Sequence, residues 1–307
     1  PVQRNYRTNI YGSLLTNTAD FNVVIAPGFN DPDNNYEVLN AKGVSQLKDL
    51  LASGTDLSKK DVIVDLNGET MDSNIALNAH SVAVENGTVD ASQLSAKAEE
   101  GVTLRNVKLA GSFPKASSNA RVIVETAGDV VVDGLDYTGA TDGYNPLEIN
   151  LRNVVSKNIT VKNCKFANFT NNAMSVFGMA EGGVLNIENN TFDLAKTSEA
   201  VRISNKTNTK FTINVKDCSY TYPSDATGQW VGFFLFEDYT STAAEVNTAM
   251  QFKNLTINVD NVTFDGAKVT ELNLFSGARN QFACMCYDNL QGLIVTDATH
   301  FPTFTFK

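Results

Sequence analysis

One short motif recurs along this chain and restricts its fold more than any other feature. The motif has six residues: the first is apolar, the third is glycine, asparagine or aspartate, and the sixth is large and apolar. Successive copies start 18, 20, 28, 29, 26, 28 and 44 residues apart. A repeat of this length predicts a solenoid in which each copy forms one coil. The copies begin at Leu66, Val84, Leu104, Val132, Val161, Ile187, Val215 and Val259.

The third residue of the motif indicates the local geometry. Glycine, asparagine and aspartate tolerate a positive φ better than other residues, so each copy predicts a sharp bend between two strands. Coils that stack ~4.8 Å apart would align these residues into a hydrogen-bonded ladder and the sixth residues into an apolar one. The bend residues are Gly68, Asn86, Asn106, Gly134, Asn163, Asn189, Asp217 and Asn261.

These ladders predict an all-β fold, a right-handed parallel β-helix of about 8–10 coils. Copies 18–20 residues apart predict tight coils, and copies 26–29 residues apart predict coils that carry loops. The 44-residue interval before Val259 leaves two interpretations open, an additional coil or a long excursion. A β-sandwich would show strands at a regular spacing of about 8–12 residues and would not explain the bends.

The two ends of the chain differ from the repeat. Residues 43–53 carry four apolar side chains at helical spacing, which predicts a short helix that caps the open core. Residues 40–60 therefore form the cap and entry, and residues 61–307 form the β-helix. Residues 1–39 are expected to end, or link from, a preceding Ig-like domain. The final segment, 301–306, predicts a short strand that seals the opposite end.

The composition excludes several functions. The chain has 34 Asp and Glu against 24 Lys and Arg, a formal net charge of −10. Nucleic-acid binding requires clustered Lys and Arg, and the sequence has no such cluster, so no nucleic-acid partner is expected. No run of 18 apolar residues occurs, so the sequence predicts no transmembrane segment.

Cysteines and acidic loops do not indicate a metal centre. Cys164 and Cys218 occupy equivalent motif positions and are expected to be buried free thiols. Cys284 and Cys286 alternate on a probable strand, so both sulfurs would share one buried face. The loop at residues 31–35 is rich in Asp and Asn, but it lacks the glycine of a calcium loop. We therefore predict no cofactor and no metal, with a structural calcium ion as the alternative.

The first residues carry a resemblance to a class of surface proteins. Residues 1–12, followed by 14–16 and 21–25, are similar to a segment of surface proteins from Bacteroides-type gut bacteria. In those proteins the segment closes a fimbrillin-like N-terminal domain of a lipid-anchored chain. Residues 62–71 resemble the opening coil of pectate-lyase-like β-helices. The resemblances imply a secreted, outer-membrane or cell-surface location with an anchored domain upstream, but a fold does not by itself specify an activity.

Catalytic motifs of polysaccharide-degrading β-helices are missing. A galacturonan hydrolase of this fold would need Gly-His-Gly and Arg-x-Lys motifs, and the sequence contains neither. The two histidines, His80 and His300, are far apart, which removes most histidine-based general-base schemes. We therefore predict no catalytic residue and keep an unrecognised lyase or glycosidase site as the alternative.

One strand in each coil offers the best candidates for a binding face. Alternation would send Val201, Phe233 and Leu235 into the core and leave acids, amides, an arginine and aromatic rings outside. Such a combination commonly binds glycans, although loops of the long coils would be an alternative cover for the rings. The candidate ligand-binding residues are Glu125, Glu148, Asn150, Ser175, Phe177, Arg202, Phe234, Phe236 and Asn273.

Glu125 and Glu148 stand on neighbouring coils of this file. Their predicted separation of about 5 Å equals that of the carboxyl pair in a retaining glycosidase. A solvated acidic face is the alternative interpretation.

Three functions remain open. We favour a non-catalytic surface module, an adhesin that binds host or dietary glycan or a surface protein. The alternatives are a polysaccharide lyase or glycoside hydrolase of the pectate-lyase-like fold, and a structural spacer. Clustered carboxylates with Lys or Arg in an open cleft would favour an enzyme. Exposed aromatic rings without paired acids would favour binding, and a smooth polar face would favour the spacer.

Overall fold

The structure is a computed structural model that describes residues 36–113, 120–141, 145–151, 154–195, 199–204, 209–226, 232–238, 252–271, 273–274, 283–288, 293–294, 299 and 301–307. For residues 238, 273–274, 283–288 and 293–294 only the backbone is described. Residues 1–37 and 38–307 form two compact units, and each is considered by itself. The candidate calcium loop, residues 31–35, lies outside the described residues.

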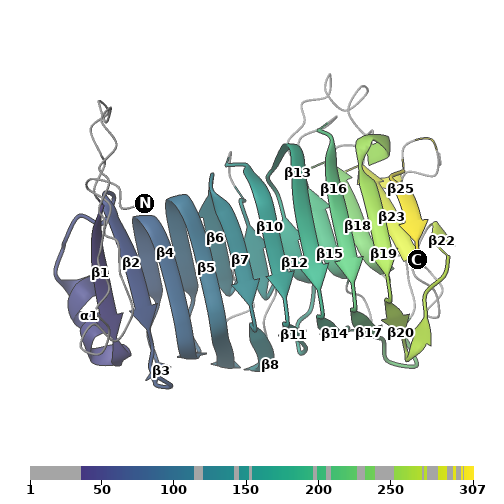
Figure 1. The fold of residues 1–307 in the computed structure, drawn as a ribbon. Coiled ribbons are helices and arrows are strands. Elements are labelled where there is room, and N and C mark those ends of the chain that lie inside the picture. The colour runs from purple at the N-terminus through teal and green to yellow at the C-terminus, as the bar shows by residue number, and fades with distance from the viewer. Residues whose placement is uncertain are drawn as a thin grey trace, which may run out of the picture. The chain divides into compact units, whose positions relative to one another are not determined.

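Residues 38–307 wind into a parallel β-helix with three faces (Figure 1). The long strands β4 (Ile75–Asp90) and β5 (Leu94–Ser112) bend through all three faces. Face A continues from them with β6 (Val122–Thr126), β9 (Leu147–Ile149), β12 (Asn172–Val176), β15 (Glu199–Ser204), β18 (Gly232–Asp238), β23 (Ala283–Asp288) and β22 (Asn273–Leu274).

Faces B and C complete each coil. Face B contains β2 (Lys60–Asp65), parts of β4 and β5, then β7 (Asp129–Asp133), β10 (Ser156–Lys162), β13 (Met179–Glu188), β16 (Phe211–Lys216), β19 (Thr256–Asp260) and β25 (Thr303–Phe306). Face C contains β3 (Thr70–Met71), parts of β4 and β5, then β8 (Asp136–Thr141), β11 (Lys165–Phe166), β14 (Thr191–Asp193), β17 (Ser219–Thr221) and β20 (Thr263–Phe264).

A few elements stand outside this pattern. Strand β1 (Glu37–Lys42) pairs with β2, and helix α1 (Gly43–Ala52) follows it directly. The short strands β21 (Ala267–Lys268) and β24 (Leu293–Ile294) add antiparallel pairs to β20 and β23. A 3₁₀ turn, η1 (Phe252–Asn254), precedes β19. Among the described residues, no helix is long and apolar enough to cross a membrane.

The core is built from files of equivalent apolar residues. On face B, Val84 pairs with Leu104, and the same file continues through Val132 and Val161 to Val259. All of these side chains are buried. Removing one such side chain from water contributes about 1.5–3 kcal/mol, so the repeated first position of the motif supplies much of the stability.

The bend residues behave as the sequence predicts. All eight have a φ between 49° and 79°, in the left-handed region. The first copy is longer by two residues, because Val64 rather than Leu66 pairs with Val84. Asn67 also has a positive φ there. The longer first bend therefore has two residues in the left-handed conformation, whereas each later bend of the motif has one.

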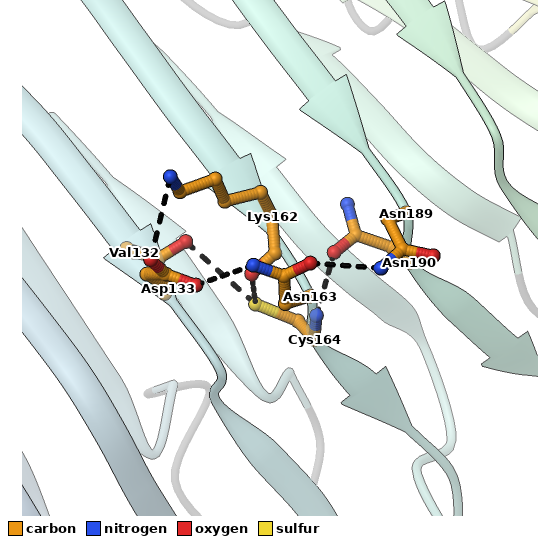
Figure 2. A network of polar contacts seen from close by, with 7 residues as sticks. All are labelled: Val132, Asp133, Lys162, Asn163, Cys164, Asn189 and Asn190. Carbon is orange, nitrogen blue, oxygen red and sulfur yellow. Dashed lines mark hydrogen bonds and ion pairs between the residues drawn. The ribbon is translucent and has the colours of Figure 1, made fainter.

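Asparagine side chains connect successive bends along the axis. Asn106 donates from Nδ2 to Asn86 Oδ1 at 3.2 Å, and Asn189 donates to Asn163 Oδ1 at 2.8 Å. Where glycine occupies the bend, a nearby aspartate supplies the acceptor. Figure 2 shows this at Asp133, whose Oδ1 accepts from Asn163 Nδ2 at 2.6 Å. The predicted ladder is thus a hydrogen-bonded file on the surface of the solenoid.

Aromatic side chains on face C stack inside the core. The rings of Phe166 and Phe192 lie 5.3 Å apart with an interplanar angle of 7°. Further along, Tyr220 packs against Phe264 at 4.7 Å between ring centroids. These contacts arise because the sixth motif residue in each coil faces its equivalent in the next coil.

The predicted capping helix is present, and the strand register decides between the two interpretations of the 44-residue interval. Helix α1 buries Leu47 and ends before Gly54, which has a φ of 66°. Val215 pairs directly with Val259, so the 44-residue interval is one long coil and not two. Strand β25 is the last described rung of face B, as expected for the final segment.

Cys164 and Cys218 are buried free thiols, and burial raises the pKa of each to about 12. They line the core as small apolar groups. The backbone of Cys284 and Cys286 pairs with Phe234 and Phe236, while their side chains lie outside the described residues.

Candidate functional site

Face A is buried on both sides over its central strands, unlike the other faces. On face B, strand β16 alternates between buried and more exposed residues, as expected for a sheet with one side in solvent. On face A, every described side chain of β9 and β12 is buried. In β15, Arg202 alone is partly exposed, and residues 232–237 of β18 are all buried. Polar residues on the outer side of this sheet are therefore shielded from water.

The strand register defines which residues share that outer side. Glu148 pairs with Ser175, and Ser175 pairs with Arg202. Ser204 pairs with Glu237 one step further along the strands. We call Glu148, Ser175, Arg202, Ser204 and Glu237 the outer polar group. Four successive coils thus bring together side chains that are 89 positions apart in sequence at the extremes.

Phe234 and Phe236 do not belong to this side, so the predicted phase of β18 is wrong. Their backbones pair with the core residues Val201 and Ile203, and both rings are fully buried. Leu235, predicted to point inward, instead pairs with Arg202. The run from Phe233 to Phe236 is apolar at every position, and alternation has no phase in such a run. The predicted stripe of exposed aromatic rings is absent from the described part of β18.

Arg202 organises the outer polar group. Its guanidinium forms an ion pair with the Glu237 carboxylate, and the side chains of the two residues are 14% and 5% exposed. The guanidinium also lies over the ring of Phe177, 5.3 Å from the ring centroid. Phe177 is therefore next to the group, as predicted, but it is buried rather than offered to solvent.

Glu148 is a buried carboxyl group that the side chain of Asn145 holds in place. Asn145 donates from Nδ2 to Glu148 Oε1 at 2.7 Å. The other oxygen, Oε2, is buried and has no hydrogen-bond partner among the described residues. Burial raises the pKa of Glu148, and the amide of Asn145 and the charge of Arg202 oppose that rise.

A second set of polar residues, the corner group, lies where the strands of face A begin. It contains Asn145, Asn172, Glu199 and Tyr222. Asn172 donates from Nδ2 to Glu199 Oε2 at 2.7 Å, and its backbone N–H donates to Asn145 Oδ1 at 3.2 Å. Burial raises the pKa of Glu199 to about 8. Asn145 thus connects the corner group to Glu148.

Within the part of the chain that the structure describes, several buried polar atoms of the two groups have no hydrogen-bond partner. Leaving a buried polar atom unsatisfied costs about 1–3 kcal/mol, so native proteins keep such atoms few. Their concentration on one face points to a site that a ligand or water completes. The atoms are Glu148 Oε2, Asn172 Oδ1, Ser175 Oγ, Glu199 Oε1 and Ser204 Oγ.

Glu125 and Asn150 make their polar contacts with other residues of the β-helix. Glu125 forms an ion pair with Lys97 at 2.6 Å. The prediction that Glu125 and Glu148 lie opposite each other is wrong, because the register places Glu148 beside Ile123. Asn150 is buried with a φ of 58°. Its side chain accepts from Thr126 N at 2.9 Å and donates to Ser156 Oγ at 2.8 Å, so it holds a turn.

The position of Asn273 differs from the expected one. Its strand, β22, pairs with β23, which lies between β22 and β18. The side chain of Asn273 is outside the described residues. In the part of the chain that the structure describes, no cluster of three or more His, Cys, Asp or Glu could hold a metal ion.

Sequence reasoning missed Asn145, Asn172, Glu199 and Glu237. Each lies at an end of an apolar strand or just outside it, where alternation gives no direction. A usable signal was the charge at the boundary of an otherwise apolar run, as in Glu199 before Ala-Val and Glu237 after Phe236.

Comparison with known proteins gives limited information. A family of unknown function, DUF6562, matches residues 1–67. Endopolygalacturonase I from Stereum purpureum, solved in complex with two galacturonates, aligns over 88% of this chain and 99% of its own, with 12% identity and a TM-score of 0.24. No curated protein matches the sequence. The parallel β-helix is evident from the strand register, and the alignment says nothing about activity. The resemblance of residues 1–25 to Bacteroides-type surface proteins stays a prediction.

Proposed function

We propose that this protein is a non-catalytic β-helix module that binds carbohydrate at the outer polar group of face A. The observation that supports this proposal is the set of buried, unpartnered oxygen atoms beside Arg202 and Phe177 among the described residues. Such groups suit a carbohydrate site, because sugar hydroxyls satisfy carboxylate, amide and hydroxyl partners. The resemblance of residues 1–25 supports a location at the cell surface.

Binding to a glycan array, followed by calorimetry on the full chain, tests the proposal. Arg202→Gln should weaken binding at least tenfold, because it removes a charged hydrogen-bond donor from the site. Glu188→Gln is the matched control, since Glu188 lies on face B between Lys162 and Lys216. A chain that binds no glycan would behave as a spacer, which contradicts the proposal.

One observation favours a second candidate function, acid–base catalysis on a polysaccharide. Burial raises the pKa of Glu148 and Glu199, whereas Glu237 is paired with Arg202. A carboxyl group whose pKa is raised by burial can act as a general acid. Reducing-sugar and unsaturated-product assays on neutral and acidic polysaccharides test this candidate. Turnover that Glu148→Gln abolishes would replace the binding proposal with an enzyme.

A further inference from the structure

The unpartnered atoms of the outer polar group differ in what they can accept and donate. Glu148 Oε2 is a carboxyl oxygen, and Ser175 Oγ and Ser204 Oγ are hydroxyl oxygens. In its ionised form a carboxylate only accepts hydrogen bonds, whereas a hydroxyl both donates and accepts. A ligand that completes this group must therefore bring hydrogen-bond donors.

Charge further restricts the ligand. The guanidinium of Arg202 already pairs with Glu237, so that interaction balances one carboxylate. Glu148 stands two strands away in the same file and has the side-chain amide of Asn145 as its partner. A second carboxylate brought by a ligand would lie beside Glu148 in a poorly solvated site, where like charges repel strongly.

Ring packing indicates where a ligand meets the group. Arg202 is the member with the largest exposure, 14% of its side chain, and it covers Phe177. The solvent-accessible edge of the group is therefore the Arg202 side, with Ser175 next in the file and Glu148 behind it.

We infer that the outer polar group selects neutral or amino-bearing saccharides and discriminates against uronates. The inference rests on the proposed function and assigns its ligand class. Hydroxyl or ammonium donors satisfy Glu148 Oε2 and the two serine hydroxyls, and a uronate carboxylate in the same place does not. Glu148 is the specificity-determining residue, and Ser175 is its closest helper.

Matched oligosaccharides test this inference on the full chain. Galactose and galacturonate oligomers of equal length differ at C6, where one carries a hydroxymethyl group and the other a carboxylate. An array should contain such pairs for several sugars, together with the free amino-sugar oligomers. We expect the neutral or amino form to bind at least tenfold more tightly than the uronate form of the same sugar.

Two variants connect the preference to the named residues. Glu148→Gln exchanges one acceptor oxygen for a donor, so it should reduce the preference against uronates by about tenfold. Ser175→Ala keeps every charge and should weaken all saccharides by a smaller factor. Glu188→Gln on face B should change neither quantity. Thermal melts of the variants verify that each is folded.

The possible failures are distinguishable. Uronates bound as tightly as their neutral forms would overturn the inference and leave carbohydrate binding intact. The same holds if Glu148→Gln leaves the preference unchanged, because the selectivity would then arise elsewhere. Binding of no saccharide on the array would overturn the proposed function, and the inference with it.

Discussion

Two ion pairs on face A differ in their exposure to solvent. Lys97 and Glu125 meet near the start of the β-helix, where their side chains are 47% and 15% exposed. Arg202 and Glu237 meet four strands further along, where the exposures are 14% and 5%. Strand β6 around Glu125 alternates between buried and partly exposed residues, whereas β9 and β12 are buried throughout.

The difference shows that position in the repeat does not decide a residue's role. Both pairs have the same place in the coil, on the outer side of one sheet. The early pair sits in solvent and adds little to stability. The later pair is largely removed from water, so each of its charges depends on the other for stabilisation.

Removing the buried cation should produce the largest effect. Arg202→Gln leaves Glu237 as an uncompensated charge with little solvent, so the free energy of unfolding should fall by about 3–5 kcal/mol. Urea denaturation followed by circular dichroism measures the change. Arg202→Lys, which keeps the charge, should recover part of it. A loss below 1 kcal/mol would show that the pair is as well solvated as the Lys97–Glu125 pair.

Glu199 should make stability depend on pH. Its pKa in the folded chain is raised from 4.5 to about 8, so the folded state keeps a proton that the unfolded state releases. This contribution is complete below pH ~4.5 and is lost as pH rises toward ~8, with a slope of at most about 1.4 kcal/mol per pH unit. Glu199→Gln mimics the protonated form and should flatten that slope, whereas Glu125→Gln near the start of the β-helix should keep it. Equal slopes in wild type and Glu199→Gln would contradict the prediction.

The contribution of a bend residue to stability should not depend on the length of its coil. Asn163 in a long coil and Asn86 in a tight coil have φ values of 56° and 58°, and each bonds both neighbours in the ladder. Alanine at either position should cost about 1–2 kcal/mol, because a Cβ without a local partner disfavours the left-handed conformation. Chemical denaturation of both variants measures this. A difference above 1 kcal/mol between them would show that coil length also matters at the bends.

The smallest effect should come from the exposed pair. Lys97→Gln removes a cation that water and salt already screen, so the expected loss is below about 1 kcal/mol. The comparison with Arg202→Gln should be made in low salt and again in 0.5 M salt. Added salt should erase the effect of Lys97→Gln and leave that of Arg202→Gln nearly unchanged.

Much of the fold was predictable, because its determinants are local. A left-handed bend needs glycine, asparagine or aspartate at one position, so Asn106 or Asn261 can be recognised without knowing its neighbours. Less of the candidate site was predictable. Glu148, Ser175 and Arg202 were expected together because alternation and coil length bring them into one file. Glu199 and Glu237 were not expected, because strand ends have no fixed direction.

The sequence by itself determined the coil. The spacing of bends, the apolar residues before and after them, and the capping helix all follow from the conformational preferences of short segments. The tertiary structure alone decided the phase of β18, which places Phe234 and Phe236 in the core and Leu235 outside. It also decided that the outer side of face A is buried around Arg202. Both depend on contacts between coils, and the free energy of burying a side chain is set by distant neighbours that no local pattern specifies.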